Sequence, residues 1–260
     1  MGRASVVAMI PARLGSERLA MKNLALVNGH PLLAWAIRAA RGAGVFERVV
    51  VNGDHPAFGE VAERYGAGFY LRRGALGSSE SRSDDVVLDF LRHHPAEVVA
   101  WVNPIAPLQT AREVREAVDH FLARGLDSLI SVEERRVHCL LGSEPVNFRR
   151  DEKFARTQDL EPVQAFVYSL MMWRTRTFQA AMEQRGHAFF CGRFEPWPVE
   201  RGSALIVKTE ADLRLADALL RAREAGSFAL RYDAAAPARR APGGAASAAR
   251  SPSDRSSILR

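Results

Sequence analysis

The sequence contains few cysteines and few lysines. Its two cysteines, Cys139 and Cys191, lack the spacing of a metal site or of a disulfide framework. We therefore expect two reduced thiols with packing roles, in a protein of the reducing cytoplasm. Only three lysines occur, Lys22, Lys153 and Lys208, so arginine carries nearly all the positive charge. A lysine offers a compact point charge where arginine offers a planar fork, which draws attention to Lys22 within an arginine-rich loop.

Long apolar runs are absent as well. No stretch approaches the ~18 residues that a membrane-spanning helix needs, and the apolar run at residues 5–10 is too short for a signal peptide. We therefore expect no membrane association. The net charge is +6, of which five arginines and two aspartates in residues 233–260 supply +3. The rest of the chain has no basic stripe with interleaved aromatic residues, so we predict no nucleic-acid partner.

Apolar segments alternate regularly with amphipathic ones through the first half of the chain. The pattern predicts strands at residues 5–10, 48–53, 68–71, 97–104 and 127–134. It predicts helices at residues 31–44, 55–68, 83–94 and 110–125, with Ser83 as a candidate N-cap of the third. Continuously apolar strands are typical of parallel sheets that are covered on both faces. We therefore predict an α/β fold with a doubly wound, mostly parallel sheet.

The alternation loosens between residues 135 and 192. We expect a small inserted lobe here that forms a homodimer contact. The apolar side chains expected to supply that contact are Phe166, Tyr168, Met171, Met172 and Trp173. A closing helix is predicted over residues 210–226, with Leu213, Leu215, Ala216, Leu219 and Leu220 on its apolar face. The folded domain is therefore expected to span residues 1–232.

Residues 233–260 are rich in alanine, proline, serine and arginine. Such a composition has little to bury, so we expect a disordered tail. A chain that ends at Tyr232 is predicted to melt at the same temperature as the full chain in a thermal unfolding scan. A drop of several degrees would show instead that the tail packs on the domain.

The segment "PARLGSERLAMKN", residues 11–23, directly follows the first predicted strand. Ligands of doubly wound sheets bind outside the carboxyl ends of the strands, so this loop lies at the expected site. Arg13, Arg18 and Lys22 bring three positive charges, and Ser16 and Asn23 lie beside them. Together with backbone N–H groups these suit a polyphosphate. The loop is neither a P-loop nor a GxGxxG fingerprint, and a solvated arginine-rich surface loop is the alternative.

The longer block "IPARLGSERLAMKNLALVNGHPLLAWAIRAA" resembles the acylneuraminate cytidylyltransferase family, the CMP-sialic acid synthetases, and less closely the CMP-Kdo synthetases. Further blocks follow in the family's order, so the resemblance covers roughly residues 4–222. It implies a Rossmann-like nucleotidyltransferase of lipopolysaccharide or surface-glycan synthesis. Such an enzyme transfers CMP from CTP to a nonulosonic acid, releases pyrophosphate and usually uses magnesium. Members of the family are typically dimers through the inserted lobe.

The resemblance also implies roles for individual residues. The nucleotide contacts would be Arg13, Ser16, Arg18, Lys22 and Asn23, with Ser81 or Ser83 on the cytosine side. Arg13 and Lys22 would be the catalytic pair, because they would stabilise the triphosphate charge as pyrophosphate leaves. The contacts to the acidic sugar would be Asn103, Gln109, Arg156, Gln158 and Tyr168.

The chain departs from the family at the metal site. Where the family carries Ser-Val-Asp-Ile-Asp-Thr, this chain reads "SALIVKTEAD". Alignment on Thr209 puts Ile206 and Lys208 in place of the two aspartates. Alignment on Ser203 puts Leu205 and Val207 there instead. Either register removes the oxygen ligands that magnesium prefers.

We therefore assign no metal ligands, and expect magnesium only as CTP carries it. Glu210 and Asp212 are interpreted as first-turn acids of the last helix, and none of the seven histidines is given a catalytic role. The alternative to an active cytidylyltransferase is a catalytically impaired relative that binds nucleotide or sugar in a regulatory or partner role.

Overall fold

The protein's computed structural model describes residues 4–77, 81–226 and 232, so the tail expected over residues 233–260 lies outside the described residues. The strands are β1 Val6–Ala12, β2 Leu26–Val27, β3 His30–Pro31, β4 Arg48–Gly53, β5 Gly68–Leu71, β6 Val98–Val102, β7 Ser128–Arg135, β8 Leu140–Leu141, β9 Glu144–Pro145, β10 Val163–Arg174 and β11 Phe194–Pro198. The helices are α1 Leu32–Ala43, α2 Ala57–Arg64, α3 Ser83–His93, α4 Ala111–Ala123, α5 Thr175–Arg185 and α6 Glu210–Glu224, with 3-10 turns η1 Lys22–Leu24, η2 Gly74–Gly77 and η3 Thr157–Asp159. None of these helices combines the length and apolar character that a membrane crossing requires.

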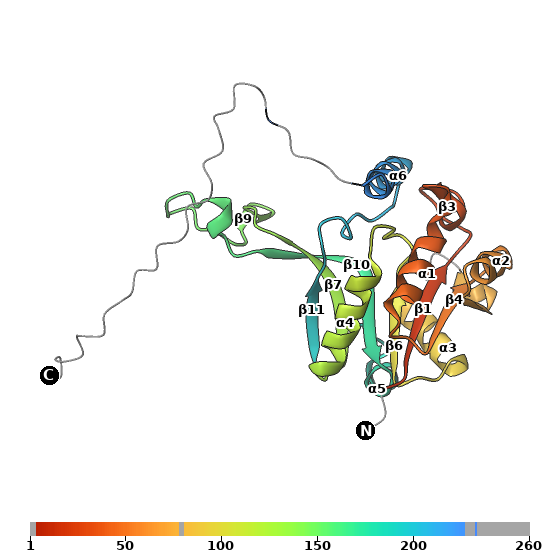
Figure 1. Ribbon diagram of the computed structural model, residues 1–260. Helices are drawn as coiled ribbons and strands as arrows, with labels where there is room; N and C mark the ends of the chain where they lie inside the picture. Colours follow the sequence, from red (N-terminus) through yellow and green to blue (C-terminus); the bar gives the residue numbers. More distant parts are fainter. Residues whose placement is uncertain (1–3, 78–80, 227–231, 233–260) are drawn as a thin grey trace, which may run out of the picture. The chain divides into compact units, whose positions relative to one another are not determined.

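Seven strands form the main sheet, in the order β11–β7–β10–β6–β1–β4–β5 (Figure 1). β1 lies near the middle and pairs in parallel with β4 on one side and β6 on the other. β5 and β11 also pair in parallel with their neighbours, whereas β10 is antiparallel to both β6 and β7. The prediction of a mostly parallel, doubly wound sheet is therefore confirmed.

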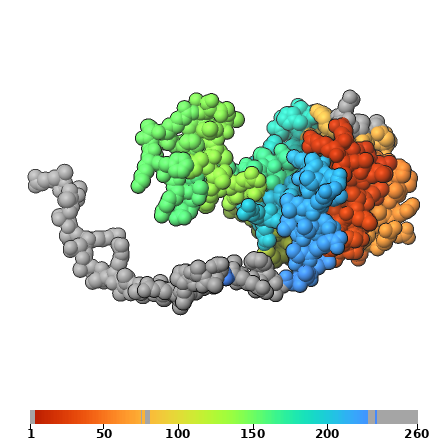
Figure 2. Space-filling model, turned by 90° about the horizontal axis from the view of Figure 1, so that it is seen from above, coloured from red at the N-terminus to blue at the C-terminus, as the bar shows by residue number. Residues whose placement is uncertain are grey.

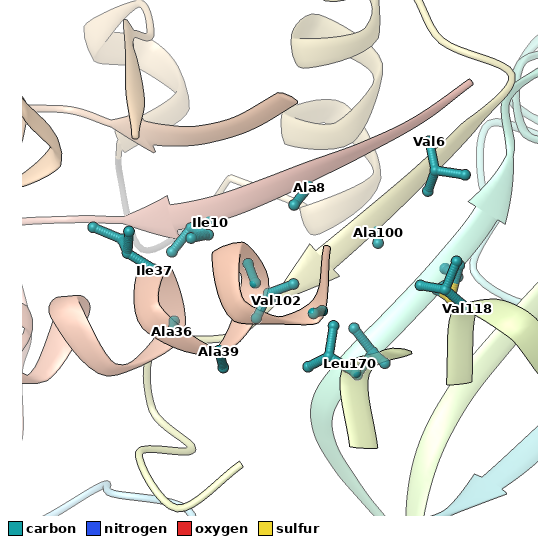
Figure 3. Close-up of a cluster of buried hydrophobic side chains, with 14 of the residues drawn as sticks. Val6, Ala8, Ile10, Ala36, Ile37, Ala39, Ala100, Val102, Val118 and Leu170 are labelled. Atoms are coloured by element: carbon teal, nitrogen blue, oxygen red, sulfur yellow. The ribbon is translucent and has the colours of Figure 1, made fainter. Parts of the chain in front are cut away.

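Helices cover both faces of this sheet, which explains why the strands are continuously apolar. Along β1, Val6, Ala8 and Ile10 enter the core that α1, α2 and α4 close, as Figure 3 shows for α1. Val7 and Met9 point to the opposite face, where α3 and α5 close a second core. Since successive side chains of a strand alternate between faces, burial on both sides requires an unbroken apolar run.

The segment from residue 135 to residue 192 is only partly a lobe. β8, β9 and η3 lie in it, and the first residues of β10 pair with the end of β7 as a ribbon that leads toward β9 (Figure 1). The second half of β10 instead lies in the main sheet between β6 and β7. Met171, Met172 and Trp173 are consequently core side chains, at most 3% exposed. Of the five side chains expected at a homodimer contact, only Phe166 and Tyr168 are exposed.

The predicted closing helix forms as α6, which begins with a capping box between Thr209 and Asp212. This confirms the interpretation of Asp212 as a first-turn acid. Ala216 and Leu220 are buried in a small core shared with Trp35 of α1, and Figure 2 shows α6 in blue beside the red N-terminal elements. The predicted apolar face is narrower than expected. Two of the leucines predicted on this face, Leu215 and Leu219, are 51% and 41% exposed, because only one side of α6 packs on the domain.

Candidate functional site

A pocket of about 220 Å³ opens at the carboxyl ends of β1 and β6. The chain passes from β1 to β4 and β5 on one side, and then returns to β6 on the other side of β1. At such a switch point the connections leave in opposite directions, which opens a crevice between them. The residues that line the pocket are Pro11, Ala12, Arg13, Ser16, Lys22, Asn23, Arg72, Leu76, Ser81, Ser83, Val86, Trp101, Asn103, Pro104 and Ile105.

Most of the residues predicted at a nucleotide site lie around this one pocket. They come from the loop after β1, from the start of α3 and from the end of β6. The predicted residues that line it are Arg13, Ser16, Lys22, Asn23, Ser81, Ser83 and Asn103. Arg18 is exposed and does not line it, although its charge acts on Lys22. The arrangement gathers cations and hydroxyl groups, which suits a phosphorylated ligand.

Three hydrogen bonds fix the loop after β1. The backbone N–H of Leu14 donates to Asp54 Oδ1 at 2.9 Å. Within the loop, Asn23 Nδ2 donates to the carbonyl oxygen of Arg13 at 3.2 Å. Lys22 Nζ donates to the carbonyl oxygen of Val207 at 3.2 Å. The loop is thus anchored to the end of β4 and to the segment before α6, so its cations are held at the pocket.

Lys22 lies in a strongly positive environment. Burial lowers the pKa of its ammonium most, and the charges of Arg13, Arg18 and Lys208 lower it further. Only Asp212 acts in the opposite direction. A pKa lowered by neighbouring cations means that the cluster is short of negative charge. An anion in the pocket would therefore relieve this repulsion.

Arg72 is a pocket residue that the sequence analysis missed. It follows β5, it is 6% exposed, and its Nη1 donates to the carbonyl oxygen of Asn52 at 2.7 Å. Its Nη2 lies 3.8 Å from Asp54 Oδ2. The Nε of Arg72 is buried and finds no hydrogen-bond partner within the described residues. A buried donor of this kind is costly unless it is satisfied, so an acceptor atom on a ligand would stabilise it.

Ser83 is not the N-cap that the sequence predicts for this helix. It is the first residue of α3, and Arg82 takes the N-cap position without a side-chain capping bond. Asp84 and Asp85 instead complement the positive end of the helix dipole. Ser83, in the first turn of α3, and Ser81, two residues before it, both line the pocket.

The residues predicted for the sugar are not gathered at one place. Asn103 lines the pocket, and its Nδ2 donates to the carbonyl oxygen of Tyr168 at 3.1 Å, which holds that residue beside the pocket rim. Tyr168 has a φ of 56° and lies where the register of β10 shifts. Gln109 is 5% exposed and donates to Ser169 Oγ at 3.3 Å, away from the pocket lining.

The two other residues predicted for the sugar belong to the lobe. Arg156 is exposed and pairs with Asp159 at 2.7 Å, and Gln158 is an exposed residue of η3. Neither lines the pocket. Arg156 and Gln158 would contact a sugar bound in this pocket only if the lobe that carries them lay against the sugar.

Carboxylates suited to a metal ion are scarce around the pocket. Among residues 4–77 and 81–226 no three His, Cys, Asp or Glu side chains come close enough together to hold an ion. Asp212 accepts hydrogen bonds from the backbone N–H groups of Lys208 and Thr209 and from the Thr209 hydroxyl, at 2.8 to 3.0 Å. These contacts hold the pKa of Asp212 below its ordinary value. Glu210 pairs with Arg214 at 2.6 Å.

Comparison with known proteins gives concordant matches. The family model described as "Cytidylyltransferase" matches residues 7–179. An N-acylneuraminate cytidylyltransferase A of Danio rerio is 34% identical over 131 residues, which is 50% of this chain and 30% of that protein. An N-acylneuraminate cytidylyltransferase of Escherichia coli is 36% identical over 121 residues, which is 45% of this chain and 28% of that protein. The matches to these two relatives therefore cover less than a third of their own lengths.

A solved structure has a similar fold. It is that of a CMP:2-keto-3-deoxy-manno-octonic acid synthetase complexed with CTP, and it superposes with a TM-score of 0.65 at 15% identity. The superposition covers 85% of this chain and 100% of that one. At this identity the likeness concerns the fold.

Proposed function

Because the chain belongs to the cytidylyltransferase family, whose model matches residues 7–179, we propose that it transfers CMP from CTP to a nonulosonic, sialic-acid-like sugar acid and releases pyrophosphate. The observation that carries this proposal is the gathering of Arg13, Lys22 and Arg72 with pocket-lining serines at the switch point of the sheet. The names of the curated relatives supply the substrate class, and the CTP complex of the synthetase with a similar fold supports the nucleotide.

In this proposal each side of the pocket binds one part of CTP. The loop after β1, with Arg13, Ser16, Lys22 and Asn23, holds the triphosphate through charge-assisted hydrogen bonds. Ser81 and Ser83 face the cytosine, since hydroxyl groups both donate to and accept from the polar edge of a base. Arg18 contributes charge from outside the lining. The sugar acid approaches from the side of Asn103 and Tyr168.

The proposed reaction is a displacement at the α-phosphorus. The anomeric hydroxyl oxygen of the sugar acid forms the new bond to that phosphorus, and the bond from the phosphorus to the bridging oxygen of pyrophosphate breaks. The hydroxyl proton passes to solvent, and pyrophosphate leaves with added negative charge. Arg13 and Lys22 stabilise that charge where it develops, which is the main catalytic contribution that fixed cations make.

Release of pyrophosphate from CTP is the direct test. Purified protein is expected to release pyrophosphate with at least one member of a panel of sialic-acid-like sugar acids, and only when both substrates are present. The alternative is a catalytically impaired relative, and the lack of three clustered metal-ligating side chains among the described residues favours it. Binding of CTP without pyrophosphate release across the panel would support that alternative.

Removal of the Arg13 side chain tests the nucleotide site. The Arg13→Ala variant is expected to bind CTP more weakly by about 1–3 kcal/mol, the usual contribution of a charge-assisted hydrogen bond. Isothermal titration calorimetry measures the change. Arg64→Ala is a matched control, because Arg64 is exposed at the end of α2, outside the pocket lining. Equal CTP affinities in the two variants would contradict the assignment.

We further propose that the protein is a homodimer through the lobe between β7 and β10. The lobe exposes large apolar side chains, Leu140, Leu141, Val146 and Phe154, of which Leu141 is 80% exposed. A second copy that covers them would remove this apolar surface from water. Leu141→Glu is expected to convert a dimer into a monomer in light scattering at micromolar concentration. Leu26→Glu, at an exposed leucine of β2, should leave the dimer intact, and a monomeric wild type would refute the proposal.

We also propose that the protein acts in the cytoplasm. Both cysteines are free thiols, which suits a reducing compartment. Burial raises the pKa of Cys191 to about 11. That thiol is therefore unreactive and serves as a small packing residue of the core, as the sequence predicts.

A further inference from the structure

Lys208 lies next to the anchor of Lys22. Lys22 Nζ donates to the carbonyl oxygen of Val207, and Lys208 is the residue that follows. Its charge acts on Lys22 together with those of Arg13 and Arg18. Arg13 and Lys22 line the pocket, whereas Arg18 and Lys208 act on Lys22 from outside the lining, and the side chain of Lys208 is exposed.

The backbone that carries Lys208 is held at both ends. The N–H of Val207 donates to the carbonyl oxygen of Ile105, a pocket residue, at 2.8 Å. The N–H of Lys208 itself donates to Asp212 Oδ2 at 3.0 Å, next to the capping box of α6. The exposed side chain of Lys208 is thus carried by a fixed backbone position, one residue from Val207, which bonds to the pocket residues Ile105 and Lys22. The flexible side chain lets the ammonium reach a bound phosphate while the backbone of Lys208 stays fixed.

The acids near this place are already engaged. Asp212 accepts three hydrogen bonds of the cap on its Oδ2, and Glu210 is paired with Arg214. Asp54 accepts from Leu14 and faces Arg72. A divalent cation such as magnesium needs several hard oxygen ligands, so the donor set at this place does not fit the metal ion that the family resemblance implies.

From this disagreement we propose that Lys208, together with Lys22, replaces a protein-bound metal ion: the two ammonium groups bind the β- and γ-phosphates of CTP and neutralise pyrophosphate as it leaves. The inference rests on the proposed function, because it assumes that CTP is the ligand of this pocket. It adds that the protein needs no magnesium site of its own.

Nucleotide binding with and without magnesium tests the inference. Wild-type protein is expected to bind CTP about equally well in EDTA and in excess magnesium, measured by titration calorimetry. In EDTA, Lys208→Met should weaken CTP binding about tenfold, the usual effect of losing one charge-assisted hydrogen bond. The same variant should bind CMP unchanged, because CMP lacks the β- and γ-phosphates. Lys153→Met is the matched control, since Lys153 is exposed within the lobe.

The outcomes separate this inference from the proposed function. Wild-type binding of CTP only in the presence of magnesium would overturn the inference and leave the proposed function standing. Equal affinity of wild type and Lys208→Met for CTP in EDTA would also overturn it. A protein that binds neither CTP nor CMP under either condition would overturn both. Metal-free, Lys208-dependent CTP binding without pyrophosphate release would support the inference and refute the enzymatic proposal.

Discussion

Under the proposed function, replacement of Lys22 by methionine is expected to lower the rate of CMP transfer by about 100-fold, which is the usual cost of removing one group that stabilises transition-state charge. The ammonium lies at the pocket, fixed through its hydrogen bond to Val207. Methionine keeps the length of the side chain and removes the charge. The loss should therefore appear in turnover at saturating CTP, measured as pyrophosphate release.

Two variants make this result specific. Lys153→Met should retain the wild-type rate, because it removes a lysine from the exposed part of the lobe. Lys22→Arg should recover only part of the activity, since a planar guanidinium does not reproduce a compact ammonium. A Lys22→Met enzyme with wild-type turnover and an unchanged melting temperature would exclude Lys22 from the reaction.

Replacement of Arg72 by methionine should destabilise the fold as well as the site. The guanidinium donates to the carbonyl oxygen of Asn52 and faces Asp54, whose side chain is only 12% exposed. Without Arg72, that carboxylate loses its cation in a largely buried place. We expect the free energy of unfolding to fall by about 3 kcal/mol, as when one partner of a buried ion pair is removed.

Urea unfolding followed by tryptophan fluorescence measures this change. Arg73→Met is the matched control, because the neighbouring arginine is exposed and its loss should leave the unfolding midpoint unchanged. Arg72→Met should also bind CTP more weakly, because the pocket loses a cation. If both variants unfold at the wild-type midpoint, Asp54 does not depend on Arg72.

Much of the sheet could be predicted because burial on both faces leaves a strong pattern. The strands at residues 48–53 and 68–71 have the predicted bounds. The five predicted helices differ from prediction by at most four residues at an end, whereas α5, Thr175–Arg185, was not predicted. Short runs of valine and isoleucine between glycine-rich turns are typical of buried strands, so the local sequence is enough to place these strands.

β10 could not be predicted in the same way. The sequence pattern around its apolar residues 170–173 favours a surface contact, because the regular alternation loosens there and the helix α5 that follows β10 was not predicted. In the structure they pair with β6 and β7, which lie far from them in sequence. Local pattern shows that a segment is apolar, but it does not show which long-range partners bury it.

Sequence pattern also does not show which single polar residues of the site are buried. Arg72 and Arg73 both follow a strand that ends at the pocket edge, and sequence alone does not show which is buried. Their position at the carboxyl end of a strand was the available signal. Gln109 faces inward because the hydroxyl groups of Ser131 and Ser169 form a buried polar network beside it. That network exists only once β7 and β10 have paired.

The hydrogen bond from Lys22 to Val207 joins residues 185 positions apart. At the usual speed of translation, about 5–20 residues per second, the ribosome makes Val207 about 10–40 s after Lys22. Throughout that interval the loop after β1 lacks one of its anchors. The segment that matches the family, residues 7–179, ends before Val207. A nascent chain of that length therefore contains the cations of the loop but cannot yet hold Lys22 in place, so the site is completed only after Val207 has been made.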